Sequence, residues 1–228
     1  MQSQDRDTRL VPYGRAKIAP GEIGEPAATL RLGVPLRLSD GPYPFPEPPD
    51  LIRIAGTAER LELLCEHLQS LCGLWDRPAR LFLDAYFRFI DRSITEGAAE
   101  LAALGAKSGG LFAPADWSFT ALRPLPQAQL LADSPAPVRA DFAFWTGDGL
   151  VAVELQAGAS PRRQRQDELA RLATAGIAVI TVAAAELQRD AERLLASLFP
   201  PTLQKFWRGV TLPASPFGPE LGEILPVR

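Results

Sequence analysis

The chain has few of the residues that build several common catalytic and metal sites. Its 228 residues include a single histidine, His67. A histidine-rich zinc site and a His-Asn-His nuclease motif both need more than one imidazole. A Ser-His-Asp triad would have to use His67, and no nucleophile-elbow glycine motif accompanies it. We therefore expect His67 to be a surface or hydrogen-bonded helix residue.

Cysteine is almost as rare, with only Cys65 and Cys72 in the chain. Both fall within one expected helix, where positions seven residues apart are separated by about 10 Å along the axis. That distance is too long for a disulfide bond. We expect both to be small residues of the core.

Long apolar runs and an excess of positive charge are also absent. No run approaches the roughly 20 apolar residues that span a membrane, and the start, MQSQDRD, has no signal-peptide core. The net charge of −3 gives no global attraction to nucleic acid, so a basic footprint has to be local. Contents of 46% apolar and 22% charged residues are typical of globular proteins. We expect a cytoplasmic protein without membrane contact.

Proline, by contrast, is abundant, with 22 residues. Residues 1–50 are expected to form a proline-rich N-terminal arm, with edge strands in 30–38 and an extended connector, GPYPFPEPP, over 41–49. Residues 200–228 form a second proline-rich tail, which leaves 51–199 as the core. The two arms are candidate surfaces for a protein partner or for assembly of several copies.

The core alternates between helical and strand periodicity. This order predicts an α/β fold, with a mixed central sheet covered by helices on both faces. The expected helices are 57–72, one beginning at Pro78, 95–104, 161–175 and 184–199, and the expected strands are 118–122, 127–131 and 177–182.

The stretch from 138 to 157, VRADFAFWTGDGLVAVELQA, predicts a β-hairpin around Thr146-Gly-Asp-Gly149. A two-residue loop would place Asp141 opposite Gln156, and a four-residue loop would place it opposite Glu154. In both cases Asp141, Glu154 and Gln156 share one face, because side chains alternate along a strand. Polar groups on an otherwise apolar hairpin would be costly to bury unpaired.

An aspartate, a hairpin and then Glu154-Leu-Gln156 resemble the PD-(D/E)XK nuclease superfamily, with glutamine at the usual lysine position. The following segment is similar to the very-short-patch-repair-like endonucleases, in which a helix carries a D-x-x-x-R…L…G pattern. The matching residues here are Asp167, Arg171, Leu172 and Gly176. The resemblance covers roughly residues 80–199 and implies a restriction-endonuclease-like fold.

It also implies metal-dependent hydrolysis of DNA phosphodiester bonds, of a repair or mobile-element type. Mg²⁺ or Mn²⁺ would be held by Asp141, Glu154 and the main-chain carbonyl of Leu155, since hard cations prefer oxygen ligands. Gln156 would stand beside the attacking water. The upstream acid that many members add would be Glu96, with Glu100 as the alternative. Candidate phosphate contacts are Arg162, Arg163 and Arg165.

Two other hypotheses compete with a nuclease. A catalytically silent protein of the same fold would bind nucleic acid or a protein partner. An unrelated α/β protein would use its proline-rich arms for assembly. Metal binding at Asp141 and Glu154 separates the first hypothesis from both others, and salt-dependent DNA binding without metal favours the silent fold.

Overall fold

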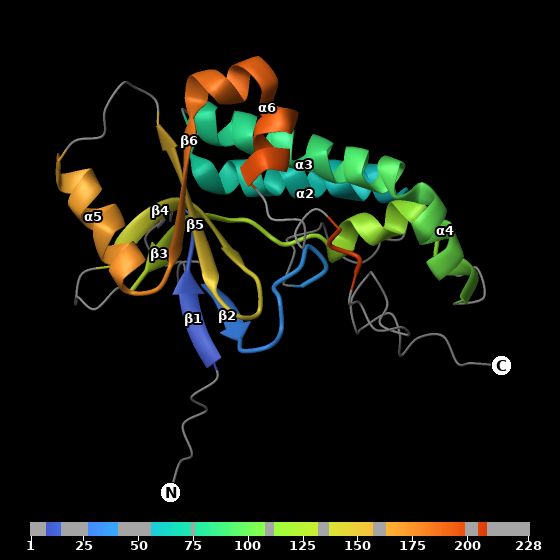
Figure 1. Ribbon diagram of the computed structural model, residues 1–228, viewed down its shortest axis with the longest axis horizontal. Helices are drawn as coiled ribbons and strands as arrows, with labels where there is room; N and C mark the ends of the chain where they lie inside the picture. Colours follow the sequence, from blue (N-terminus) through green and yellow to red (C-terminus); the bar gives the residue numbers. More distant parts are fainter. Residues whose placement is uncertain are drawn as a thin grey trace, which may run out of the picture. The chain divides into compact units, whose positions relative to one another are not determined.

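The computed structural model describes residues 8–14, 27–40, 56–73, 76–107, 112–131, 137–156, 163–198 and 205–208 (Figure 1). The connector over 41–49, Arg162 and most of the expected C-terminal tail lie outside these residues. The chain divides into two compact units. Unit 1 comprises Met1–Leu36, Leu68–Leu83 and Arg123–Ala191, and unit 2 comprises Arg37–His67, Asp84–Leu122 and Glu192–Arg228.

A four-stranded mixed sheet forms the centre of unit 1, in the order β3-β4-β5-β6. Its first three strands pair antiparallel, and β6 runs parallel to β5 after the crossover helix α5. The expected α/β class with a mixed sheet is confirmed. The bounds are β3 Leu125–Leu130, β4 Val138–Trp145, β5 Leu150–Gln156, α5 Arg163–Thr174 and β6 Ala178–Ala183.

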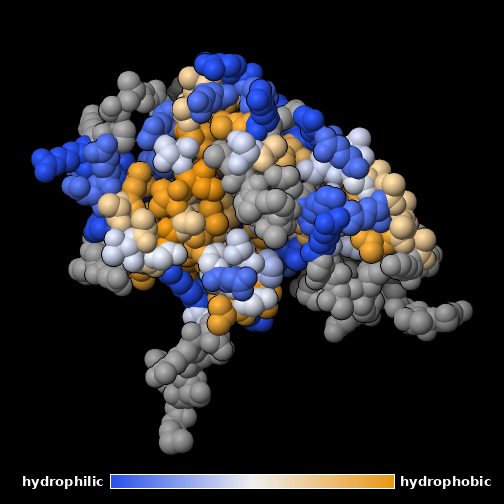
Figure 2. Space-filling view, viewed as in Figure 1, coloured by the Kyte–Doolittle hydropathy of each residue, from blue (hydrophilic) through white to orange (hydrophobic). Residues whose placement is uncertain are grey.

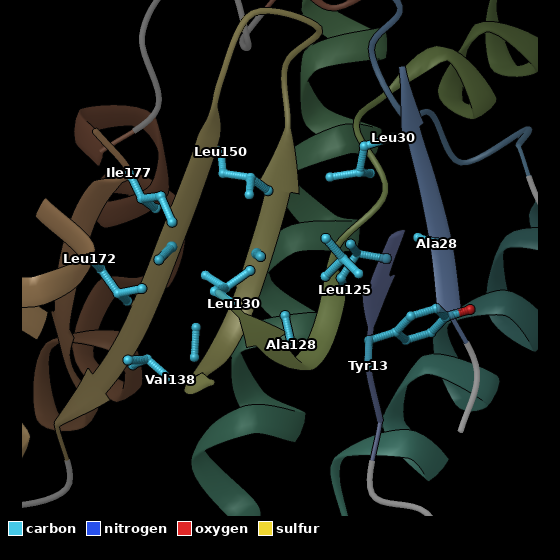
Figure 3. Packing of buried hydrophobic residues seen from close by; sticks show 14 residues of the cluster. Tyr13, Ala28, Leu30, Leu125, Ala128, Leu130, Val138, Leu150, Leu172 and Ile177 are labelled. Atoms are coloured by element: carbon cyan, nitrogen blue, oxygen red, sulfur yellow. The ribbon is translucent and has the colours of Figure 1, made fainter. Parts of the chain in front are cut away.

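Side chains from opposite faces of this sheet contact different helices. Phe142 on β4 stacks on Phe82 of α3 with ring centroids 4.6 Å apart. Ala152 on β5, opposite Ala143, belongs instead to a buried cluster that includes Leu172 of α5. Figure 3 shows Leu172 and Ile177 on one side of this cluster, with Tyr13, Ala28 and Leu30 on the other.

The N-terminal segment adds a two-stranded antiparallel sheet to unit 1, made of β1 Thr8–Pro12 and β2 Ala27–Arg31. Alternate residues of β2 are buried, which fits a strand with one face on the core. Gly14 also donates its backbone N–H to the carbonyl of Pro126, at 2.6 Å. Part of the expected N-terminal arm is therefore packed strand.

Three helices follow the expected ranges closely, namely α2 Thr57–Cys72, α3 Arg77–Glu96 and α6 Ala184–Leu198, the last with non-helical backbone at Asp190. The helix expected over 95–104 is instead α4 Ala98–Lys107, because α3 extends to Glu96. Cys65 and Cys72 on α2 do not form a disulfide, and Cys72 is buried whereas Cys65 is half-buried. None of the described helices is long and apolar enough to cross a membrane.

One expected strand is wrong. Residues 114–120 form a 3₁₀ helix, η1 Pro114–Thr120, where a strand over 118–122 was expected. Short apolar runs do not distinguish a buried strand from a buried helical turn. Here Asp116 accepts the backbone N–H of Ala113 at 2.8 Å, a local bond that closes a turn. The other expected strand, over 127–131, corresponds to β3.

The sheet ends at β6, which has no partner strand on its outer side among the described residues. Figure 2 shows apolar surface in the region of β6 and the elements around it. The strand itself, AVITVA, carries no charge, and Val179 and Ile180 are partly exposed.

Candidate functional site

The predicted hairpin forms with a four-residue loop, Thr146–Gly149. Thr146 donates its backbone N–H to the carbonyl of Gly149 at 3.1 Å, and Gly147 has φ +97°, which glycine adopts without strain. The register pairs Phe142 with Val153 and Trp145 with Leu150. Continued by one residue, it sets Asp141 opposite Glu154, so the four-residue alternative is the one realised.

The segment after β2 holds the hairpin turn. Gly33 donates its N–H to the carbonyl of Gly147 at 2.8 Å, and Leu36 donates to that of Trp145 at 3.2 Å. The indole of Trp145 donates in return to the carbonyls of Arg31 and Val34. These bonds fix the far end of the strands that carry the carboxylates.

Asp141 occupies a break in the sheet's hydrogen bonding. The β4–β5 pairing ends at Phe142 and Val153, although both strands continue beyond it. In place of a backbone bond, Asp141 Oδ2 accepts the N–H of Leu155 at 2.7 Å. The carboxylate therefore lies at the end of the paired region, next to the backbone that follows Glu154.

Burial and the nearby charge of Glu154 raise the pKa of Asp141 to about 6. The charge of Asp76 raises this pKa further, whereas the Leu155 N–H and the guanidinium of Arg165 lower it. A carboxyl group that titrates near pH 6 is what burial beside a second carboxylate is expected to produce.

Glu154 is 8% exposed and is paired with Arg165 of α5. Arg165 Nε donates to Glu154 Oε1 at 2.6 Å, and its Nη2 donates to Oε2. The remaining Nη1 donates to Glu168 Oε2 at 2.8 Å. Hydrogen bonds to these carboxylates raise the pKa of Arg165, and Arg165 in turn lowers the pKa of Glu168.

Helix α5 is positioned by its apolar residue Leu172 and by its C-terminus. Leu172 is fully buried, and its carbonyl accepts the N–H of Ile177 at 3.0 Å. Gly176 has φ +77°, the left-handed conformation that commonly ends a helix. Leu172 and Gly176 of the D-x-x-x-R…L…G pattern therefore have structural roles, while Asp167 and Arg171 are exposed.

The structure brings together four of the expected site residues, Asp141, Glu154, Leu155 and Arg165. Gln156 ends β5, partly buried, on the same face as Glu154 by strand alternation. Arg163 is exposed on the first turn of α5.

Glu96 and Glu100 both belong to unit 2. Glu96 is the last residue of α3 and pairs with Arg92 at 2.8 Å, so it does not belong to the helix expected over 95–104. Glu100 does lie in the first turn of α4, where it pairs with Arg208 and Lys205. Whether either acid acts at the site stays a prediction.

Three residues near Asp141 and Glu154 were missed by sequence reasoning. Glu168 shares Arg165 with Glu154, and an acid three residues after an arginine on a helix could have indicated it. Gln127 is buried on β3, and its amide donates to Asp76 Oδ2 at 3.5 Å. No local pattern marks Gln127 or Asp76.

The carboxylate oxygens of Asp141 and Glu154 are ligands that suit a hard cation. Arg165, however, already donates hydrogen bonds to both oxygens of Glu154. Among the residues that the structure describes, no three His, Cys, Asp or Glu side chains are grouped so as to hold a metal. A cation at this position would therefore have to displace the guanidinium. As it stands, the arrangement is a largely buried ion pair beside a carboxyl group of raised pKa.

Comparison of the chain with protein-family models, curated proteins and solved structures finds no match.

Proposed function

We propose that the chain is a metal-dependent DNA endonuclease with a restriction-endonuclease-like fold, of a repair or mobile-element type. The observation that carries the proposal is that the Asp141 carboxylate accepts the N–H of Leu155, the residue that follows Glu154 on β5. The crossover through α5 to the parallel strand β6 supports it, since this is the element order that the sequence resemblance implies. A cytoplasmic location and assembly through the proline-rich arms are further parts of the proposal.

In this proposal Asp141, Glu154 and the carbonyl of Leu155 would hold Mg²⁺ or Mn²⁺. A bound divalent cation would help to activate the attacking water and would neutralise charge that builds up on the phosphate. Asp141 would have to lose its proton to become a ligand, and its pKa of about 6 makes this possible near neutral pH. Glu154 would have to release Arg165.

Arg165 would then supply the positive charge that the family usually draws from lysine. Gln156 is neutral and provides only hydrogen bonds. A guanidinium released from Glu154 stays close to the carboxylates, because Glu168 still accepts its Nη1. Its planar donors match phosphate oxygens. Arg163, exposed on the same helix, and Arg162 remain candidate contacts to the DNA backbone.

Plasmid nicking with Mg²⁺ or Mn²⁺ tests the proposal. The native protein is expected to nick in a metal-dependent manner, and Asp141→Asn and Glu154→Gln are expected to abolish nicking. Glu186→Gln removes an exposed acid on α6 and serves as the matched control. Metal-dependent nicking that persists in both site variants would overturn the assignment of these carboxylates.

A second candidate function is a catalytically silent protein of the same fold that binds nucleic acid or a protein partner. The bidentate Arg165–Glu154 pair favours it, because the pair leaves the site neutralised without a cation. This alternative predicts DNA binding that weakens with salt and needs no metal. Nicking by the native protein would exclude it.

A further inference from the structure

Gln127 has an unusual backbone conformation for a residue within a strand. Its φ is +52°, and among the described residues it is the only non-glycine residue with a positive φ. It is also only 4% exposed. A left-handed conformation is strained for a non-glycine residue, so the surrounding structure has to hold it in place.

The position of Gln127 in the sheet connects it to Asp141. Pro126 pairs with Phe142 and Ala128 pairs with Ala140, so Gln127 stands opposite Asp141. Between Leu125 and Leu130 this is the one position where the β3–β4 register contains no pair. Because the β4–β5 pairing also stops at Phe142, Asp141 is paired with neither neighbouring strand.

The side chain of Gln127 reaches toward the start of α3. Its Nε2 donates to Asp76 Oδ2 at 3.5 Å, and Asp76 Oδ1 accepts the N–H of Ala79 at 3.3 Å. Asp76 thus contacts both the first turn of α3 and the irregular residue of β3.

We propose that Gln127 is a positioning residue. Its left-handed backbone prevents the backbone of Asp141 from pairing with β3 and leaves the Asp141 carboxylate directed at the N–H of Leu155. An extended residue at 127 would restore the missing β3–β4 pair and bind the backbone of Asp141 to β3. The inference deepens the proposed function, because it explains how Asp141, one of the proposed metal ligands, is oriented. It concerns the orientation of Asp141 and does not itself require catalysis.

The test compares Gln127→Val, Gln127→Gly and the control Gln129→Val by NMR. Valine strongly disfavours positive φ, whereas glycine accepts it. Gln129 lies two residues further along β3, in regular pairing with Arg139. The signal is the scalar coupling across the hydrogen bond between Leu155 ¹⁵N and Asp141 ¹³Cγ, together with the exchange rate of the Leu155 amide.

The native protein, Gln127→Gly and Gln129→Val are expected to show the coupling. Gln127→Val is expected to lose it, with Leu155 exchange on the order of tenfold faster. A coupling that persists in folded Gln127→Val would overturn the proposal. If that variant does not fold, the Gln127→Gly variant decides. Loss of the coupling in Gln127→Gly would overturn the proposal, because it would show that the left-handed backbone alone does not orient Asp141. A native protein that shows the coupling but no metal-dependent nicking would overturn the proposed function and leave this inference intact.

Discussion

Arg165 donates two hydrogen bonds to Glu154, one to each carboxylate oxygen, and so ties α5 to the end of β5. The pair is largely buried, since the side chain of Arg165 is 23% exposed and that of Glu154 is 11% exposed. A bidentate pair of this kind neutralises Glu154 and fixes its orientation. It also places the guanidinium where the proposed metal ion would need access to Glu154.

Removing Arg165 should destabilise the fold. Arg165→Met leaves Glu154 buried without its partner, and we expect a loss of about 2 to 3 kcal/mol in the free energy of unfolding, because the pair is not wholly buried. Adding Glu154→Gln to this variant should recover part of the loss. Urea denaturation measures both, with Arg163→Met on the exposed surface as the control. Equal stabilities of the Arg165 and Arg163 variants would contradict a structural role for the pair.

Mn²⁺ should stabilise the native protein through Asp141 and Glu154. A divalent cation that displaces Arg165 from Glu154 would bind both carboxylates, and binding to the folded state raises the melting temperature by mass action. We expect the shift to be much smaller in Asp141→Asn. It should be larger in Arg165→Met, where no guanidinium competes for Glu154. Equal Mn²⁺ shifts in all three proteins, measured by differential scanning fluorimetry, would place any bound metal elsewhere.

The stability of the protein should fall with rising pH in a way that depends on Asp141. Its pKa is about 6 in the folded protein, against an ordinary value of 3.8, so the folded state binds this proton more tightly. The stabilisation is complete below about pH 4 and is lost as pH rises through about 6, by at most about 3 kcal/mol. Asparagine cannot titrate, so the difference between native and Asp141→Asn stability should change over this window. A difference that stays constant from pH 4 to pH 8 would contradict the raised pKa.

The sequence predicted the elements whose signal is local, and missed the features that depend on contacts between distant segments. The helix over 57–72 and the hairpin around Gly147 follow from periodicity and turn residues. Strand alternation also predicts that Asp141, Glu154 and Gln156 share one face for either loop length.

The partner of each site residue could not be predicted in this way. Arg162 comes just before α5, and Arg163 and Arg165 lie in its first turn. Only the placement of α5 in the structure shows that Arg165 contacts Glu154. The left-handed backbone of Gln127 has no signal in the sequence, because glutamine has no preference for that conformation. Likewise, a short apolar run ending at Leu122 did not reveal the 3₁₀ turn of η1.

In unit 2, Gly97 should be sensitive to the smallest substitution. A Cβ at this position would lie 2.6 Å from Cζ2 of Trp207, a residue that is only 2% exposed. The indole would have to move, so Gly97→Ala is expected to cost about 1 to 3 kcal/mol. Gly149→Ala is the matched control, since a Cβ there meets nothing within 4 Å. Thermal unfolding of both variants measures the effect, and similar melting temperatures would contradict the close approach of Trp207.

Gln156→Lys provides the sharpest test of the proposed chemistry, because the family usually has lysine at this position. Gln156 is partly buried on the same face as Glu154, so a new ammonium there would lie near carboxylates and should stay protonated. We therefore expect the variant to keep its fold and to keep or raise metal-dependent nicking. If Gln156 instead acts as a structural hydrogen-bonding group, the added charge should lower stability by a few kcal/mol. Melting temperatures and plasmid nicking of the native and variant proteins distinguish the two cases. A clear loss of stability, with no nicking by either protein, would favour the silent binding protein over the nuclease.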